Sequence, residues 1–201
     1  INLERATYYL SRAESEKKLY YISNTTSEVE DPDPTKHIGL LLKGLKNVTI
    51  QGNGSTFVMT GKMTSFVIDQ SENIVFKNLN FDYQFPTQTE IKVLEESENE
   101  LKAQVHPTSQ YRIDNGKLEW YGDGWGFSKG IAQAYDYEKD ITWRTWSPMD
   151  NLLQTEEIEP NVLRMQYSSK PMGNVGLTYQ IRDAIRDEVC GFVQQSKKVA
   201  F

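Results

Sequence analysis

Short runs of alternating apolar and polar residues recur in the first part of the chain. Val48-Thr49-Ile50 and Ile74-Val75-Phe76 alternate with a period of two, which is typical of β-strands. An asparagine, Asn47 or Asn73, precedes each run. Asparagine tolerates the left-handed backbone conformation that a sharp corner needs. The pattern therefore predicts short strands joined at tight corners.

The same pattern is repeated at a fixed interval. Residues 39–59 can be laid over residues 65–83 with a constant offset of 26 residues (74 − 48 = 26), so that Val48 falls on Ile74 and Ile50 on Phe76. A repeat of about 20–50 residues indicates a stacked architecture. We expect the first coils of a right-handed parallel β-helix with these apolar residues stacked inside. The alternative is a β-sandwich in which two similar strands align by chance.

Beyond Tyr83 a different pattern begins. Half-polar segments at short intervals, separated by turn signals such as Asp114-Asn115-Gly116, indicate antiparallel strands. The region is too long for a plain loop, and it holds all four tryptophans. We expect an inserted antiparallel β-barrel-like module over residues 84–187. Its predicted strands are residues 89–95, 100–106, 116–122, 140–146, 161–167 and 175–181.

The first pattern then returns. Residues 192–201 can be laid over residues 67–76 (192 − 67 = 125), with Val199 on Ile74 and Phe201 on Phe76. We therefore expect residues 188–201 to resume the β-helix. Phe201 falls in the middle of a predicted strand, and an uncapped coil would expose an apolar face. The sequence is accordingly expected to be the front portion of a longer protein.

The first 36 residues are predicted to cap the coils, so that the first structural region covers residues 1–83. Within the cap, residues 6–11 and 18–23 are tyrosine-rich and favour strands. The polar segment between them is either a connection or one helical turn.

Composition excludes several classes of protein. The net charge of −6 and scattered cations argue against a nucleic-acid partner. Cys190 is the only cysteine and there are two histidines, so neither an internal disulfide nor a Cys- or His-based zinc site is expected. No apolar run approaches the roughly 20 residues that cross a bilayer. We find no nucleotide-binding or cofactor-binding motif and expect no metal or cofactor.

Three stretches carry a family resemblance. They are KNVTIQGNGS, SENIVFKNLNFDYQFPTQTEIKV and YQIRDAIRDEVCGFVQQSKKVAF. Together they resemble glycoside hydrolase family 110, whose members are α-1,3-galactosidases built on a parallel β-helix with a β-barrel inserted into it. The resemblance covers nearly the whole chain from about Tyr8. It implies a bacterial enzyme, secreted or periplasmic, that acts on galactose-terminated glycans.

The resemblance also implies a reaction. Hydrolysis of a terminal α-1,3-linked galactose with inversion needs two carboxyl groups about 6.5–9.5 Å apart. The family's catalytic acids are associated with an adjacent pair of aspartates, and this sequence contains no such pair. We therefore assign no catalytic residue here. The catalytic carboxylates are expected beyond residue 201, and this chain alone is expected to be inactive.

Five residues are candidates for substrate binding. Arg182, Asp183, Arg186 and Asp187 lie where the insert returns to the coils, and an arginine held by a carboxylate can grip sugar hydroxyls. The same four residues are equally typical of a surface ion-pair network. Trp125, flanked by glycines, is expected to stack on a sugar face, whereas the alternative places it in a barrel core.

Other chemically notable residues are given structural roles. Asp69 and Asp82 are interpreted as solvated carboxylates at corners. Trp143 and Trp146 are expected in the core of the insert, and Cys190 is expected to be buried.

Two further functions remain as alternatives. The first is a non-catalytic carbohydrate-binding or adhesin-type β-helix in which the insert recognises the ligand. The second is a lyase or endo-hydrolase of acidic polysaccharides, which the acidic balance of the chain disfavours.

Overall fold

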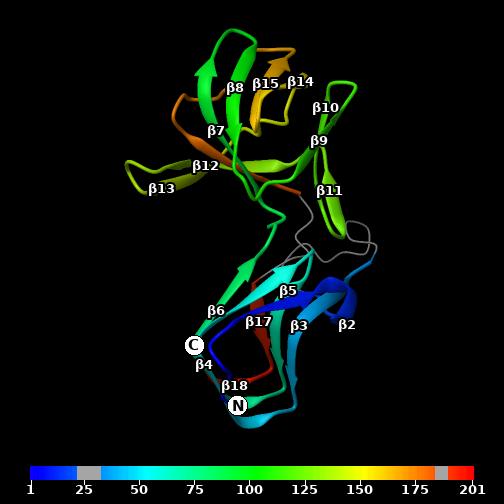
Figure 1. Ribbon diagram of the computed structural model, residues 1–201, viewed down its shortest axis with the longest axis vertical. Helices are drawn as coiled ribbons and strands as arrows, with labels where there is room; N and C mark the ends of the chain where they lie inside the picture. The colour runs from blue at the N-terminus through cyan, green and yellow to red at the C-terminus, as the bar shows by residue number, and fades with distance from the viewer. Residues whose placement is uncertain (22–32, 184–189) are drawn as a thin grey trace. The chain divides into compact units, whose positions relative to one another are not determined.

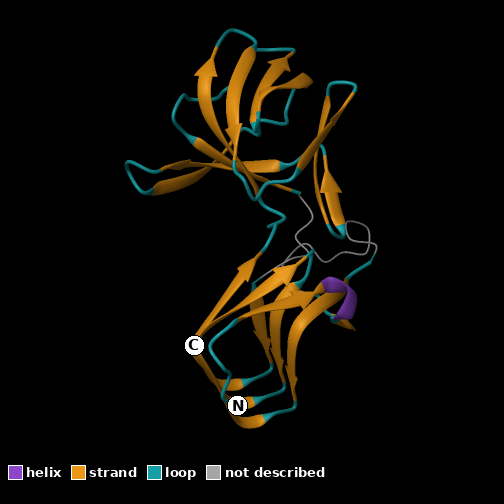
Figure 2. Cartoon of the chain, viewed as in Figure 1, coloured by secondary structure: helices purple, strands orange, loops and turns teal. Residues whose placement is uncertain are grey.

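The computed structural model describes residues 1–21, 33–183 and 190–201. Their secondary structure is almost entirely strand and loop, with one 3₁₀ turn, η1 (Arg12–Glu14), among the described residues (Figure 2). The all-β class predicted from the sequence is confirmed. The chain divides into two compact units, the first formed by Ile1–Gln84 with Ile185–Phe201 and the second by Phe85–Ala184. Each unit is described by itself below.

Two four-stranded sheets make up the described part of the first unit (Figure 1). One has the order β1-β4-β6-β18 with parallel neighbours throughout, and the other has the order β17-β5-β3-β2, in which only β2 is antiparallel to its neighbour. The strands are β1 (Thr7–Ser11), β2 (Glu16–Leu19), β3 (Thr35–Lys43), β4 (Lys46–Thr60), β5 (Thr64–Asp69), β6 (Glu72–Tyr83), β17 (Gly191–Gln194) and β18 (Lys197–Ala200).

The register between these strands is the one that the repeat predicts. Val48 pairs with Ile74, and Ile74 pairs with Val199 on its other side. Ile50 pairs with Phe76, whose ring stacks on that of Phe201 at 5.7 Å between centroids. Residues 125 positions apart are therefore neighbours in one sheet.

The corners use the asparagines as predicted. Asn47 and Asn73 have φ values of 55° and 56°, and Lys198 has the equivalent conformation at 53°. The side-chain amide of Asn73 donates to Asn47 Oδ1 over 2.8 Å. Left-handed backbone is costly for most side chains but much less so for asparagine. The stacked amides therefore stabilise two successive corners together.

Apolar residues from successive strands form the core of the first unit. Phe66, Ile68, Ile74 and Phe76 are each less than 9% exposed. Burial of such a side chain contributes roughly 1.5–3 kcal/mol.

The second unit is antiparallel. Its described strands form a seven-stranded sheet of order β13-β12-β16-β7-β8-β15-β14 and a three-stranded sheet of order β11-β10-β9 (Figure 1). The strands are β7 (Thr89–Glu96), β8 (Glu100–Val105), β9 (Tyr111–Asp114), β10 (Lys117–Gly122), β11 (Trp125–Phe127), β12 (Ile131–Asp136), β13 (Ile141–Thr145), β14 (Leu152–Glu159), β15 (Val162–Tyr167) and β16 (Thr178–Arg182).

One large apolar cluster forms the core of the second unit. Trp120 is fully buried in it, and Trp146 packs against it. The expectation that Trp143 lies in the core is wrong, because its side chain is 39% exposed. Trp143 lies on β13, which is one of the two edge strands of the seven-stranded sheet and has exposed residues along most of its length.

Candidate functional site

The predicted arginine–aspartate cluster is only partly within the described residues. Arg182 is the last residue of β16 and Asp183 follows it, and both are half-buried and have interaction partners. Arg186 and Asp187 lie outside the described residues. Substrate binding by these four residues stays a prediction.

Antiparallel pairing places three polar side chains in a row beside Arg182. Gln133 on β12 lies opposite Gln180 on β16, which lies opposite Glu90 on β7. The amide of Gln133 donates to Gln180 Oε1 over 2.6 Å, and the amide of Gln180 donates to Glu90 Oε1 over 2.6 Å. We call these three residues the polar ladder. Successive hydrogen bonds hold its side chains in fixed orientations.

Arg182 lies on the same face of the sheet as the polar ladder. Side chains alternate between faces along a strand, so Arg182 and Gln180 share a face, and Ile131 lies opposite Arg182. Tyr135 extends the same face by two residues beyond Gln133. Its hydroxyl donates to Asp140, and this hydrogen bond raises the pKa of Tyr135.

This face offers hydrogen-bond donors and acceptors close together. Amides both donate and accept, the guanidinium only donates, and the carboxylate of Glu90 only accepts. Such a set suits a neutral ligand with several hydroxyl groups. Gln133, Gln180 and Glu90 carry no distinctive signal in the sequence, because their proximity follows from pairing between segments far apart in the chain.

Trp125 lies on the other sheet of the second unit and is half-buried. It is opposite Gly122, where a Cβ atom would come within 2.4 Å of the indole nitrogen, and its ring stacks on Phe127 at 5.8 Å. The indole N–H is buried without a hydrogen-bond partner among the described residues. Trp125 packs against the core cluster, and its stacking on a sugar stays a prediction.

The interpretation of Asp69 as a solvated carboxylate is wrong. Asp69 is only 4% exposed, accepts a hydrogen bond of 2.9 Å from the Tyr20 hydroxyl and lies 3.1 Å from Lys43 Nζ. Burial, followed by the hydrogen bond to Asp69, raises the pKa of Tyr20 to about 12. These contacts join the N-terminal segment to β3 and β5. Asp82 is exposed and accepts a hydrogen bond from the Tyr83 amide.

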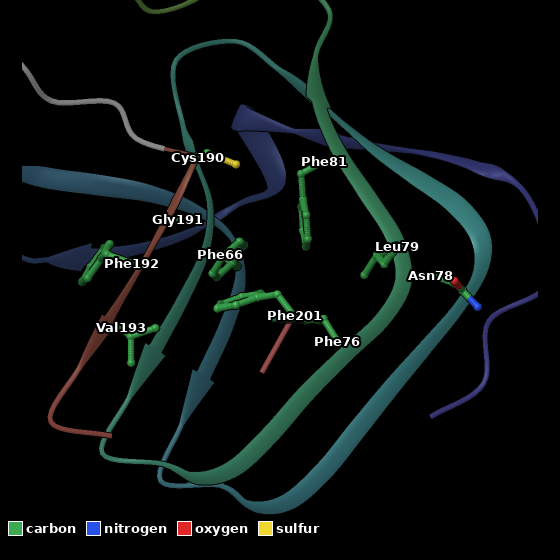
Figure 3. Close-up of a pocket in the computed structure, with 10 residues that line it drawn as sticks. All are labelled: Phe66, Phe76, Asn78, Leu79, Phe81, Cys190, Gly191, Phe192, Val193 and Phe201. Carbon is green, nitrogen blue, oxygen red and sulfur yellow. The ribbon is translucent and has the colours of Figure 1, made fainter. Parts of the chain in front are cut away.

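A cavity of about 560 Å³ in the first unit is largely apolar (Figure 3). The rings of Phe66, Phe76, Phe81 and Phe201 gather on it, with centroids 4.9–5.7 Å apart in the contacting pairs. Cys190 also lines the cavity and is exposed, so the expectation of a buried thiol is wrong. Among the residues that the structure describes, no carboxylate lines this cavity, so these residues do not supply the groups for acid–base hydrolysis there.

The described residues hold neither a candidate metal-binding cluster nor a candidate membrane-spanning helix. No group of three or more His, Cys, Asp or Glu side chains is placed to hold a metal ion. No described helix is long and apolar enough to cross a membrane.

Comparisons with known proteins show what the chain is similar to. Residues 87–178 match the model of the GLAA-B beta-barrel domain I. The chain is 62% identical over 192 residues to Alpha-1,3-galactosidase A of Bacteroides thetaiotaomicron, covering 96% of this chain and 34% of that relative. It is 32% identical to a protein of the same name from Bacteroides fragilis, covering 99% of this chain and 33% of that relative.

The matched relatives are longer than this chain, which spans about a third of their length. The family model coincides with most of the second unit, whereas the matches to the two relatives run through nearly the whole chain. The resemblance to glycoside hydrolase family 110 noted in the sequence is thereby confirmed.

Proposed function

We propose that the protein hydrolyses terminal α-1,3-linked galactose from glycans, with inversion at the anomeric carbon. The observation that carries this proposal is the 62% identity, over 96% of this chain, to a protein named Alpha-1,3-galactosidase A. Such identity supports a shared substrate class in the whole protein. An enzyme of this kind works on extracellular glycans, and we propose a secreted or periplasmic location.

For the first unit we propose the start of a right-handed parallel β-helix. Its support is the parallel pairing of β4, β6 and β18 and of β3, β5 and β17 at matching offsets. The second unit is then an insertion between the second and third coils. The proposed boundaries are 1–83 for the cap and first coils, 84–187 for the insert and 188–201 for the resumed coil.

The catalytic carboxylates are proposed to lie beyond residue 201. Inversion needs one carboxylic acid and one carboxylate with space between them for water. Asp69 is buried and paired with Tyr20 and Lys43, and Glu90 accepts from Gln180. Neither is therefore a suitable acid or base, and the present chain is proposed to be inactive by itself.

Within this chain, Arg182, Asp183, Arg186, Asp187 and Trp125 are proposed to contribute to substrate binding. The polar ladder beside Arg182 supports this role, because its amides and carboxylate match the hydroxyl groups of a sugar. The ladder also favours a second candidate function, in which the insert recognises carbohydrate and the protein has no hydrolytic activity.

An assay of the whole protein and of this chain, side by side on α-1,3-linked galactobiose, tests these proposals. We expect the whole protein to release galactose and the chain to release none. Proton NMR during the first turnovers should show β-galactose before mutarotation. Failure of the whole protein to release galactose would favour the binding function. Turnover by the chain would disprove the proposed position of the carboxylates, and initial α-galactose would disprove inversion.

A further inference from the structure

A second polar and aromatic group lies on the three-stranded sheet of the second unit. Glu119 and Tyr121 are two residues apart on β10, so they share a face, and Arg112 on β9 lies directly opposite Glu119. On the other side of β10, Gly126 on β11 lies opposite Tyr121. Leu118 and Trp120 point to the opposite face and are buried in the core. We call Arg112, Glu119 and Tyr121, together with Gly126, the β10 surface.

The charged pair on the β10 surface leaves several polar atoms open. Both Nε and Nη2 of Arg112 contact the same oxygen, Glu119 Oε2, at 2.8 and 2.7 Å. Glu119 Oε1 and the Tyr121 hydroxyl have no hydrogen-bond partner among the described residues. The guanidinium keeps further N–H donors because one carboxylate oxygen cannot use all five. The pair is thus held in place while its outward donors and acceptors remain accessible.

The ring of Tyr121 is covered on one side and open on the other. The Arg112 guanidinium lies 5.5 Å from the ring centroid, on the side of β9. On the side of β11 the neighbouring position is Gly126, which has no side chain. The side chain of Tyr121 is 36% exposed. The face of the ring on the side of β11 therefore has no side chain of residue 126 beside it.

The backbone conformation at position 126 does not require a glycine. Its φ is not in the left-handed region, where glycine would be favoured. A Cβ atom there would lie 3.1 Å from Glu119 Oε1 and 3.9 Å from the Tyr121 Cβ. A side chain at this position would therefore crowd Glu119 Oε1 and lie beside Tyr121, and glycine avoids both contacts.

We propose that the β10 surface is a binding site for a galactose residue of a glycan. The C–H groups on one face of galactose would stack on the open face of Tyr121, while neighbouring hydroxyls would donate to Glu119 Oε1 and accept from Arg112. The choice of galactose as the ligand rests on the proposed function, whereas the location of the site is argued from the geometry of β9, β10 and β11 alone.

Titration of the isotopically labelled 201-residue chain with methyl α-galactoside, followed by amide NMR, tests the proposal. We expect saturable shifts in β9, β10 and β11, with a dissociation constant in the millimolar range. Tyr121→Ala, which removes the stacking ring, should weaken binding by about tenfold or more. Gly126→Val, which places a side chain beside the open face of the ring, should do the same while retaining Tyr121 itself. The matched control Tyr137→Ala removes a tyrosine that is 64% exposed on another hairpin and should bind normally.

Several results would overturn the proposal. These are shifts confined to other strands, unchanged affinity in both Tyr121→Ala and Gly126→Val, or an equal loss in Tyr137→Ala. Methyl α-glucoside serves as the counter-probe, and equal affinity for it would overturn the assignment of galactose. Tryptophan emission identifies a misfolded variant, since the buried Trp120 is in the same strand. The titration requires no turnover, so its failure is separate from any failure of the whole protein to release galactose.

Discussion

Among single residues, Tyr20 makes the stability of the folded protein depend on pH. Its pKa is raised from 10.0 to about 12, first by burial and then by the hydrogen bond to Asp69. The unfolded chain therefore loses this proton at lower pH than the folded protein does. Stability from Tyr20 is fully present below about pH 10 and is lost as the pH rises through about 12. Urea unfolding followed by circular dichroism on either side of pH 10 should show this loss.

The Tyr20→Phe variant isolates this contribution. It removes the hydroxyl, so it should unfold about 1 kcal/mol more easily at neutral pH and lose less stability than the natural chain above pH 10. Tyr9→Phe, at a position that is 66% exposed, is the control and should behave as the natural chain at every pH. Parallel pH profiles for the natural chain and Tyr20→Phe would contradict the assigned role of the hydroxyl.

A second prediction concerns the stability of variants at a corner asparagine. Asn73 combines a φ of 56° with a hydrogen bond to Asn47. Asn73→Gly keeps access to the left-handed conformation and loses only the hydrogen bond, at a cost of about 0.5–1 kcal/mol. Asn73→Ala also incurs backbone strain of about 1 kcal/mol. In chemical denaturation the natural chain should therefore have the highest unfolding midpoint, Asn73→Gly a lower one and Asn73→Ala the lowest. A glycine variant less stable than the alanine variant would contradict this account.

At the level of one hairpin, replacing Gly122 on β10 and Gly126 on β11 by alanine should have different effects, because the two positions face opposite sides of the sheet. A Cβ at Gly122 would lie 2.4–2.9 Å from the rigid indole of Trp125, whereas the atom nearest to a Cβ at Gly126 would be the flexible end of Glu119 at 3.1 Å. Gly122→Ala should displace Trp125 and shift tryptophan emission to longer wavelength, with a stability loss of about 1–3 kcal/mol. Gly126→Ala is the control and should leave emission unchanged. Equal emission from the two variants would show that Trp125 does not depend on Gly122.

The strands of the first unit were predictable because stacking fixes an interval. Apolar residues 26 or 125 positions apart pair, as Ile74 does with Val48 and Val199. The interval changes to 24 after Gln51, since Ser55 pairs with Leu79. The two additional residues on β4 lie at Gln51–Ser55, where Asn53 and Gly54 have positive φ. A rigid repeat of 26 could not predict this local irregularity.

In the second unit, the sequence predicted the strands in which apolar and polar residues alternate clearly, but it did not predict the others. The predicted segments correspond to β7, β8, β10, β13, β15 and β16. The strand β12 was missed because alanine and glutamine have little preference for strands, and β11 because it has only three residues. The strand β14 carries four acidic residues or glutamines among its eight, which hides its apolar face.

The candidate site was less predictable than the fold. Arg182 could be proposed from the sequence because it lies near the end of the predicted insert. Gln133, Gln180 and Glu90 come together only through the pairing of β12, β16 and β7, and β12 itself was missed. Side-chain hydrogen bonds between distant strands leave no periodic signal that a single sequence reveals.

For the whole molecule, each unit has its own apolar clusters. The sixteen buried residues of the largest described cluster, from Ile91 to Ile181, all lie within the second unit. The clusters of the first unit draw Phe192 and Val199 from the end of the chain onto residues of β3 to β6. A core supplied from one continuous segment can form without the rest of the chain.

We therefore predict that residues 85–184 fold when produced alone. Trp120 is fully buried in this unit, and its indole N–H lies 3.2 Å from Met149 Sδ. The isolated unit should retain the tryptophan emission of the whole chain, give a dispersed amide NMR spectrum and unfold cooperatively in urea. Trp120→Ala is the destabilised reference, with an expected loss of about 3–5 kcal/mol. Emission typical of exposed tryptophan from the unmutated unit would mean that its core needs the first unit, because all four tryptophans of the chain lie in residues 85–184.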